Sequence, residues 1–293
     1  MSTRRENTPA CAAYNRALDP GNYGYHPSLA AGVVFSTIFG LIAIGHLVIV
    51  MRTRVYWIVL FSIGATIETI GWVGRAIGYH CPYSRSLFLM QTATLIMGPS
   101  WTQAGIYIAL WVLVRGLGRK TSPFSPTVYL FGCFVADVVC LSLQATGGGL
   151  AGSAYSKHES TDPGTKTMVA GIISQLGVAV VFCFLFAVVV HRGATQLRDP
   201  GNRKLWHITI AIVTAISMMI MRNVYRSIEL LQGWRGYLIT HERFVVGLDA
   251  VPMTISMATF LVIQPTMGLI KRKVHDQGSR PETTLTESSR EKE

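Results

Sequence analysis

Residues 168–190 read MVAGIISQLGVAVVFCFLFAVVV, a run without any aspartate, glutamate, lysine or arginine. A helix of about 20 apolar residues crosses the hydrocarbon core of a bilayer. Six further apolar segments of similar length occupy most of the chain. The expected segments are Ser28–Met51, Val55–Tyr79, Leu87–Val114, Thr127–Thr146, Met168–Val190, Trp206–Ile228 and Phe244–Ile270. This pattern predicts an all-α integral membrane bundle of seven transmembrane helices.

The composition supports this fold and leaves no room for a second globular domain. The chain is 50% hydrophobic and only 14% charged. Membrane β-barrels show short alternating segments rather than long apolar runs. We expect an N-terminal tail at residues 1–27, the transmembrane domain at 28–270 and a disordered tail at 271–293, which is rich in Ser, Thr and Glu. The first 27 residues lack the apolar centre of a cleavable signal peptide.

The formal net charge of +11 comes from basic residues at the ends of the expected helices. That placement excludes a nucleic-acid-binding surface as its purpose. The loops after odd-numbered helices and the start of the C-terminal tail carry twelve basic residues, and the opposite side carries eight. The positive-inside rule therefore predicts an external N-terminus and a cytosolic C-terminus.

Five cysteines fall into two groups. Cys133, Cys140 and Cys183 lie within apolar segments, where cysteine packs as a small apolar side chain. Cys11 and Cys81 both fall on the expected outer face. A disulfide from the N-terminal tail to the loop after the second helix fits this placement, and two unpaired thiols fit it equally well.

Charged and amide side chains recur inside the apolar segments, although charges at membrane depth are costly and usually face a cavity or a partner. Their spacings of three, four and seven residues place them on single helix faces. With the predicted orientation, they converge on the outer half of the bundle. We expect the substrate-binding set to be Glu68, Arg75, Asp137, Gln144, Gln175, Arg222, Arg226, Glu229, Glu242 and Asp249.

Two interpretations of these charges remain open. They either line a polar cavity that opens outward, or form fixed salt bridges, with Glu68 joined to Arg75 and Arg222 or Arg226 joined to Glu229. Carboxylates outnumber arginines in the set by two. A carboxylate surplus suits a cationic headgroup, such as the amine of a lipid.

Glycines and prolines within or between the apolar segments lead to three further structural predictions. Gly147-Gly148-Gly149 is expected to open a long loop that continues to Lys166. Pro99 and Pro252 each free a backbone carbonyl and favour a kink in their helices. Gly74 and Gly78 form a small-xxx-small pair, which is expected to let another helix of the monomer approach closely.

The sequence lacks the motifs that mark several classes of membrane protein and enzyme. The last helix has no lysine for a retinal Schiff base, and no nucleotide-binding P-loop is present. No group of histidines, cysteines and acids has convincing zinc spacing. The residues that mark ordinary G-protein-coupled receptors are also missing. We expect no cofactor, and the lack of a nucleophile or zinc constellation argues against a lipid enzyme.

Short motifs, one for each of several helices, resemble the fungal RTA-like family, also called lipid-translocating exporters. The matching pieces are Glu68-Thr-Ile-Gly71-Trp-Val-Gly-Arg75, Gly98-Pro99-Ser-Trp-Thr-Gln-Ala104-Gly-Ile-Tyr107, Asp137 through Gln144-Ala-Thr-Gly147-Gly148-Gly149, Gly171-Ile-Ile-Ser-Gln175-Leu-Gly177 and Arg222-Asn-Val-Tyr-Arg226-Ser-Ile-Glu229, followed by Gly233, Gly236, Glu242 and Asp249. The resemblance implies a seven-helix plasma-membrane protein linked to resistance to toxic amphiphiles and to export of sphingoid long-chain bases. One relative is linked to haem and protoporphyrin traffic.

The leading hypothesis is therefore a translocase that moves amphiphilic lipids within the bilayer toward the outer leaflet. Glu68, Asp137, Glu242 and Asp249 would receive the amine. The arginines Arg75, Arg222 and Arg226 would keep those carboxylates charged or bind a headgroup phosphate. The alternative is a seven-helix sensor of lipid or stress whose C-terminal tail binds a cytosolic partner.

Overall fold

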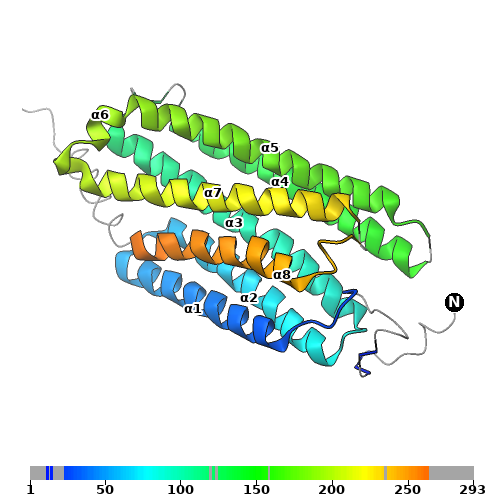
Figure 1. The fold of residues 1–293 in the computed structure, drawn as a ribbon. Helices are drawn as coiled ribbons and strands as arrows, with labels where there is room; N and C mark the ends of the chain where they lie inside the picture. The colour runs from blue at the N-terminus through cyan, green and yellow to red at the C-terminus, as the bar shows by residue number, and fades with distance from the viewer. Residues whose placement is uncertain are drawn as a thin grey trace, which may run out of the picture.

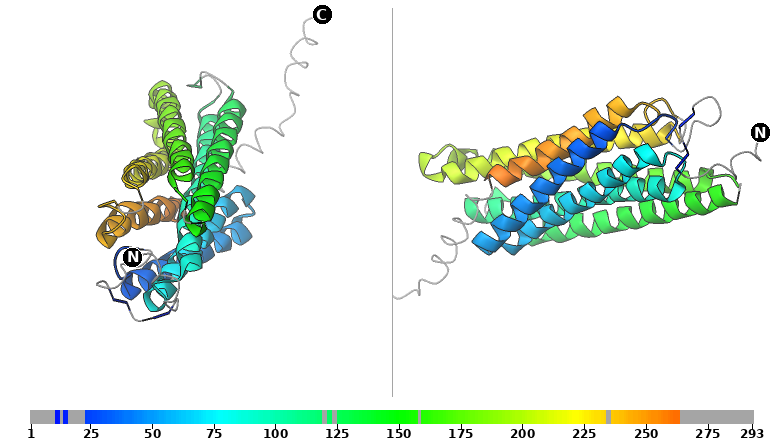
Figure 2. Two further views of the ribbon diagram at one scale, coloured as in Figure 1. Left: turned by 90° about the vertical axis from the view of Figure 1, so that its right-hand side faces the viewer. Right: turned by 90° about the horizontal axis from the view of Figure 1, so that it is seen from below.

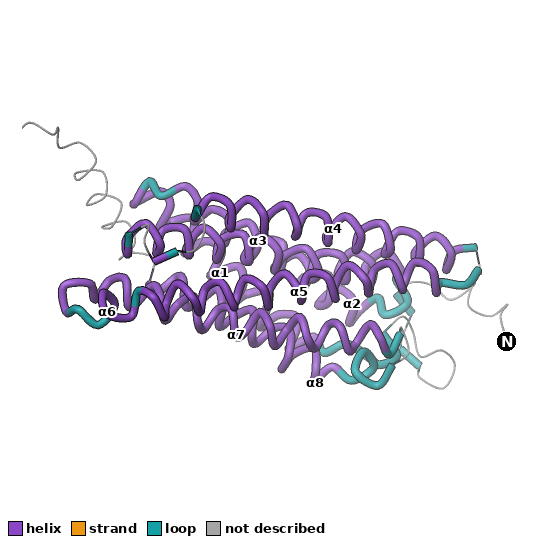
Figure 3. The backbone as a smooth tube through the Cα atoms, turned by 90° about the horizontal axis from the view of Figure 1, so that it is seen from above, coloured by secondary structure: helices purple, strands orange, loops and turns teal. Residues whose placement is uncertain are grey.

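The computed structural model describes residues 11–12, 14–15, 23–118, 121–122, 125–157, 159–233 and 236–263. Throughout these ranges the regular structure is helical, without a strand (Figure 3). The elements in order are α1 (Leu29–Thr53), η1 (Tyr56–Ile58), α2 (Val59–His80), α3 (Arg85–Leu117), α4 (Pro126–Ser156), α5 (Asp162–Arg192), α6 (Ala194–Leu197), η3 (Pro200–Asn202), α7 (Arg203–Leu231), α8 (Glu242–Val245) and the π-helical η4 (Val246–Ala250). The last helix continues from η4 through residues 251–263. The expected tail at 271–293 lies outside the described ranges.

Six helical stretches of the described chain are long and apolar enough to cross a membrane. They are Leu29–Thr53, Tyr56–His80, Leu130–Ala154, Asp162–Arg192, Arg203–Leu231 and Glu242–Ile263. The remaining expected span, Leu87–Val114, is helical within α3. Polar residues such as Gln91, Thr102 and Gln103 interrupt the apolar pattern of α3, so length and composition support six spans rather than seven.

The long helices form an elongated bundle in which α3 is central (Figures 1 and 2). Helix α3 contacts α2, α4 and α7, while α1 pairs with α2 and α4 pairs with α5. Successive long helices run in opposite directions. The segment before α1 and the connections after α2, α4 and α7 therefore meet at one end, called here the N-terminal end of the bundle (Figure 1).

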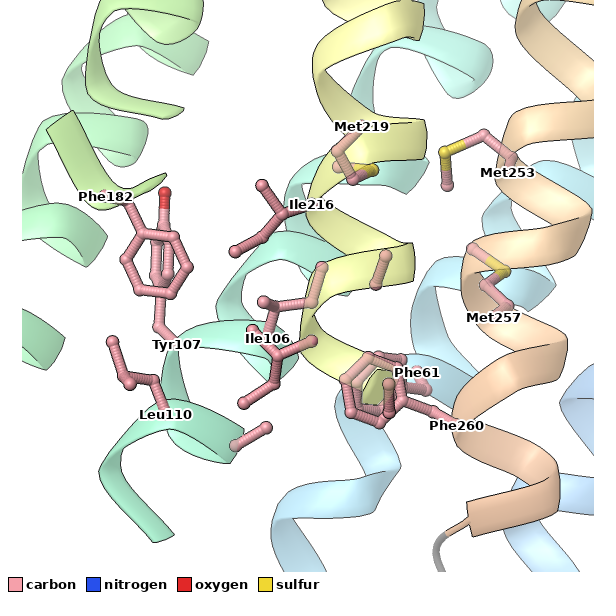
Figure 4. Packing of buried hydrophobic residues seen from close by; sticks show 14 of the residues in the cluster. Phe61, Ile106, Tyr107, Leu110, Phe182, Ile216, Met219, Met253, Met257 and Phe260 are labelled. Atoms are coloured by element: carbon pink, nitrogen blue, oxygen red, sulfur yellow. The ribbon is translucent and has the colours of Figure 1, made fainter. Parts of the chain in front are cut away.

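Apolar side chains occupy both the centre and the outside of the bundle. Phe61, Ile106, Met257 and Phe260 pack together between helices (Figure 4). On the outside, Phe131 is 69% exposed. The charged side chains within the apolar helices are instead almost fully buried. When lipid surrounds a helical bundle, apolar side chains are expected on its outside and charged side chains in its interior.

The expected loop at Gly147–Lys166 is wrong, because α4 continues to Ser156 and α5 begins at Asp162. The glycines serve close helix packing instead of chain reversal. A Cβ on Gly147 would lie 2.4 Å from the backbone nitrogen of Met168, and one on Gly164 would lie 2.3 Å from that of Ala151. Only residues without a side chain allow two helix backbones to approach this closely.

Gly74 packs against α3, as expected, whereas Gly78 does not face another helix. Gly74 is covered by the Met90 side chain, and Gly78 is covered by the hydroxyl end of Tyr23. Side chains fill the space that these two glycines leave. Closer helix approach occurs at other glycines. Gly32 of α1 faces the backbone of Ala76, and a Cβ on Gly64 of α2 would lie 3.0 Å from the carbonyl oxygen of Gly98 in α3.

The segment before α1 packs on the N-terminal end of the bundle. A disulfide joins Cys11 to Cys81, at the end of α2. Ser28 caps α1 by accepting a hydrogen bond from the backbone nitrogen of Ala31. The disulfide holds Cys11 at the N-terminal end of the bundle, close to the helices that carry the buried charges.

Alanine in place of Gly147 is expected to lower the melting temperature, because its Cβ would meet the α5 backbone and overpacking costs about 1–3 kcal/mol. Thermal unfolding in detergent micelles, followed by intrinsic fluorescence, measures the change. Gly149→Ala is the matched control, since nothing lies within 4 Å of a Cβ there. A Gly147→Ala protein that melts no lower than the Gly149→Ala protein contradicts the packing role.

Candidate functional site

Helical spacing brings the buried charges to facing surfaces near the N-terminal end of the bundle. Glu68 and Arg75 lie two turns apart on one face of α2, and Arg222 and Arg226 lie one turn apart on α7. All four side chains are at most 8% exposed. The carboxylate partners of the three arginines come from α7, α8 and η4, so the site joins segments far apart in the chain.

The end layer, nearest the N-terminal end, consists of Arg75, Glu242, Tyr25 and the backbone of Ser28. Arg75 Nη2 lies 3.0 Å from Glu242 Oε1, and its Nε donates to the same oxygen at 3.1 Å. Arg75 also donates to the Tyr25 hydroxyl. The Ser28 nitrogen donates to Glu242 Oε1 and Oε2 at 3.0 and 3.1 Å. This layer ties the segment before α1 to both α2 and α8.

Aromatic rings surround the Arg75 guanidinium in the end layer. Its central carbon lies 5.9 Å from the ring centroid of Tyr23, 5.5 Å from that of Tyr25 and 5.6 Å from that of Trp72. Such distances permit cation–π attraction. Burial raises the pKa of Tyr23 to about 12, against the lowering effect of Arg75, and burial likewise raises the pKa of Tyr25. Both phenols therefore stay neutral at physiological pH.

The deep layer consists of Arg222, Arg226, Glu229 and Asp249. Arg226 Nη1 lies 2.9 Å from Glu229 Oε2, and Arg226 Nη2 binds Asp249. Arg222 Nε lies 2.7 Å from Asp249 Oδ1. Asp249 thus bridges both arginines of α7. It lies in η4, a π-helical turn that precedes Pro252, and proline disturbs the hydrogen bonds of the preceding turn.

Pro99 gives Arg222 its second acceptor. A proline has no N–H, so the carbonyl of Leu95, four residues earlier in α3, receives no helical hydrogen bond from that position. Arg222 Nη2 donates to this carbonyl. The helix-breaking residue in α3 therefore completes the coordination of an arginine on α7.

Glu68 differs from the other carboxylates of the site. The expected Glu68–Arg75 salt bridge is not formed, because Arg75 pairs with Glu242. Glu68 is 2% exposed and packs on Gly98, where an added Cβ would lie 2.9 Å from Glu68 Oε1. That oxygen has no hydrogen-bond partner among the described residues. Glu68 is thus a buried carboxylate beside the deep layer without a direct ion pair.

A small cavity lies between the two layers. Its volume is about 30 Å³, and its lining includes Tyr25 and Arg75 from the end layer and Arg226 and Glu229 from the deep layer. This volume holds about one water molecule. The space is far too small for a lipid headgroup.

The remaining expected site residues form two further hydrogen-bonded groups between α3, α4 and α5. Tyr107 donates to Asp137 Oδ2 at 2.8 Å and accepts from Gln103 at 2.5 Å. In the second group, Gln144 donates to Gln175 at 2.9 Å, and Gln175 donates to Ser100 at 3.0 Å. Among the described residues, no hydrogen bond or ion pair joins these groups to the two charged layers.

Sequence reasoning missed Tyr23, Tyr25, Tyr107 and Gln103 as partners of the charges. The two N-terminal tyrosines were assigned to an external tail, although aromatic residues are unusual in a solvated tail. Tyr107 and Gln103 lie four residues apart on α3, one turn from Ser100. Their helical spacing was the available signal. The described residues include no cluster of histidine, cysteine and acidic side chains suited to a metal ion.

Comparisons with known proteins agree with this architecture. Residues 61–272 match the family model described as RTA1 like protein. The chain is 28% identical over 277 residues to "Sphingoid long-chain base transporter RSB1" of Saccharomyces cerevisiae, covering 83% of this chain and 72% of that protein. It is 29% identical over 216 residues to "Protoporphyrin uptake protein 1" of the same yeast, covering 71% and 68%. No solved structure matches the chain.

The match also spans most of the site. Glu68, Asp137, the α7 charges and Asp249 all lie within the matched residues 61–272. The relatives named for an activity are transport proteins rather than enzymes. With its six apolar helices, the chain is a multi-pass membrane protein, and it belongs to the RTA1-like protein family.

Proposed function

We propose that this protein is a plasma-membrane transporter that moves amphiphilic lipids with a cationic headgroup toward the outer leaflet and so confers resistance to them. Sphingoid long-chain bases are the proposed substrates. The observation that carries the proposal is the unequal pairing of buried charges. All three arginines have carboxylate partners, whereas Glu68 has no direct ion pair. An amine entering beside Glu68 supplies the missing cation.

The proposed topology has seven spans with the N-terminus outside and the C-terminus in the cytosol. Helix α3 is 33 residues long and runs alongside the six apolar helices (Figure 1). Polar residues are tolerated in a spanning helix that other helices surround. Seven of the twelve basic residues counted in the sequence are described, and they lie at the opposite end, which supports a cytosolic location for that end. The charged layers then lie in the external half of the bundle.

The small volume of the cavity supports a role for the end layer as an external gate. A long-chain base has a headgroup much larger than one water molecule, so passage requires the two layers to separate. Arg75, Glu242, Tyr25 and Ser28 join three segments through hydrogen bonds around one carboxylate. Breaking those bonds is the proposed opening step, and the deep layer then receives the amine.

A tetrapyrrole is the second candidate substrate, because a relative is named as a protoporphyrin uptake protein. Its carboxylates would need free arginines. Each arginine of the site is already paired with a carboxylate in the described structure. The charge arrangement therefore favours an amine over a porphyrin carboxylate.

Glu68→Gln and Asp249→Asn are each expected to lower transbilayer movement of a fluorescent sphingoid base by tenfold or more, since a lost charge-assisted contact is worth about 1.5–3 kcal/mol. The assay uses purified protein in liposomes and follows probe in each leaflet. Glu159→Gln, an exposed acid, is the control. Unchanged movement in both variants would refute the site.

The same liposomes discriminate between the candidate functions. An N-acylated base, which has no charged amine, is expected to move slowly in wild-type protein and to be insensitive to Glu68→Gln. Protoporphyrin movement in place of base movement favours the second candidate. No movement of either compound in folded protein favours a membrane sensor.

Glu242→Gln is expected to open the end layer, because the neutral amide loses the ion pair with Arg75. The cost is about 1–3 kcal/mol, below that of a fully buried pair since Glu242 is 20% exposed. Hydrogen exchange measured by mass spectrometry should rise in residues 23–31 and at the end of α2. Exchange equal to that of Glu159→Gln protein would argue against the gate.

A further inference from the structure

A polar track runs between α3, α4 and α5, apart from the charged layers. Ser100, Gln103 and Tyr107 lie at positions i, i+3 and i+7 of α3, which places them on one face. Asp137 and Gln144 share a face of α4 through a spacing of seven residues. The hydrogen bonds already described join these two faces to each other and to Gln175 of α5.

The track has more acceptors than its hydrogen bonds use. Asp137 Oδ1, Gln103 Oε1 and Gln144 Oε1 are buried, and none has a hydrogen-bond partner within the described part of the chain. The three side chains are 4%, 3% and 3% exposed. Buried polar atoms are nearly always satisfied. Three unpartnered acceptors in one track indicate a ligand that donates hydrogen bonds or carries positive charge.

Asp137 is the charged member of the track and has no cation beside it. Tyr107 from α3 and Cys133 and Cys140 from α4 are the titratable groups that interact with it in the described chain. Helix α5 contributes the apolar ring of Phe182, whose centroid lies 4.6 Å from the centroid of the Tyr107 ring. No arginine, lysine or histidine of the described residues forms an ion pair with Asp137.

The smallest ligand that satisfies Asp137, the one charged acceptor of the track, is a proton. Proton binding converts the Asp137 carboxylate to a neutral carboxylic acid and removes the cost of a buried uncompensated charge. The Tyr107 hydroxyl already occupies Oδ2, so Oδ1 is the free acceptor. Glu68, the proposed amine site, interacts with the charges of the deep layer, whereas Asp137 interacts with Tyr107, so the proton site and the amine site have different neighbours.

The polar track also offers a route toward the N-terminal end of the bundle. Helix α4 ends there, and Gln144 lies two turns, about 10 Å, nearer to that end than Asp137. Gln144, Gln175 and Ser100 are joined by hydrogen bonds at this level. Side-chain amides and hydroxyls of this kind support water molecules that carry protons.

We propose that Asp137, held by Tyr107 and Gln103, is a proton-binding site that couples a pH gradient to transport. The coupling rests on the proposed transport function, whereas proton binding itself does not. One proton is taken up by Oδ1 on one side of the membrane and released on the other, without any redox step. A one-to-one exchange converts a pH difference of one unit into a substrate ratio of about tenfold.

Infrared difference spectroscopy tests proton binding without substrate. Titration is carried out in a Glu68→Gln background, because Glu68 is a second buried carboxylate without an ion pair. In nanodiscs this protein is expected to show the carbonyl band of a protonated buried carboxylic acid, and the band should be lost when Asp137→Asn is added. Asp137→Glu should retain the band at a shifted position, which separates proton binding from misfolding. Asp162→Asn, at the exposed start of α5, is the matched control. A band that persists in folded Asp137→Asn protein overturns the assignment.

Flux measurements in liposomes test the coupling. A pH gradient is expected to drive base accumulation by wild-type and Asp162→Asn protein, whereas Asp137→Asn should equilibrate the base without accumulation. Stimulation that survives in Asp137→Asn, or that follows a sodium gradient instead, overturns the coupling role. Absence of flux in wild-type protein would instead count against the transport function, and the infrared result would still decide proton binding.

Discussion

Three guanidinium groups are buried in a bundle whose outer surface is apolar, and each must find acceptors inside the protein. Isolated charge in such an environment costs several kcal/mol or more. Arg75, Arg222 and Arg226 meet this requirement through carboxylates and a carbonyl from other helices. The requirement connects α2, α3, α7 and the last helix, together with the segment before α1.

The same requirement explains why helix irregularities lie at the site. The carbonyl of Leu95, freed by Pro99, becomes an acceptor for Arg222. Asp249 reaches two arginines from a π-helical turn rather than from regular α-helix. Both features cost backbone hydrogen bonds, and the charged side chains recover part of that cost. Proline and π-turns therefore contribute directly to charge pairing in this fold.

Two carboxylates of the expected site, Glu68 and Asp137, have no ion-pair partner in the described chain, and their surroundings differ. Glu68 lies beside the paired arginines, whereas Asp137 accepts a hydrogen bond from Tyr107 and forms no ion pair with a cation of the described chain. A charge count treats these acids alike. Their neighbours distinguish them, since an amine approaching Glu68 enters an ionic network, while Asp137 faces neutral hydrogen-bonding groups. The division supports separate sites for the proposed substrate and the proposed proton.

Much of this arrangement was predictable because it depends on local pattern. Apolar length and helical spacing are properties of neighbouring residues, so the sequence by itself determined the all-helical membrane character, most helix positions and the faces that carry Glu68, Arg75 and the α7 charges. Partner choice is not local. Arg75 and Glu242 are 167 residues apart, and glycines 147–149 suggest a turn until α5 is placed against Gly147. Only the tertiary structure decided these contacts, because pairing and close packing depend on which helices become neighbours in space.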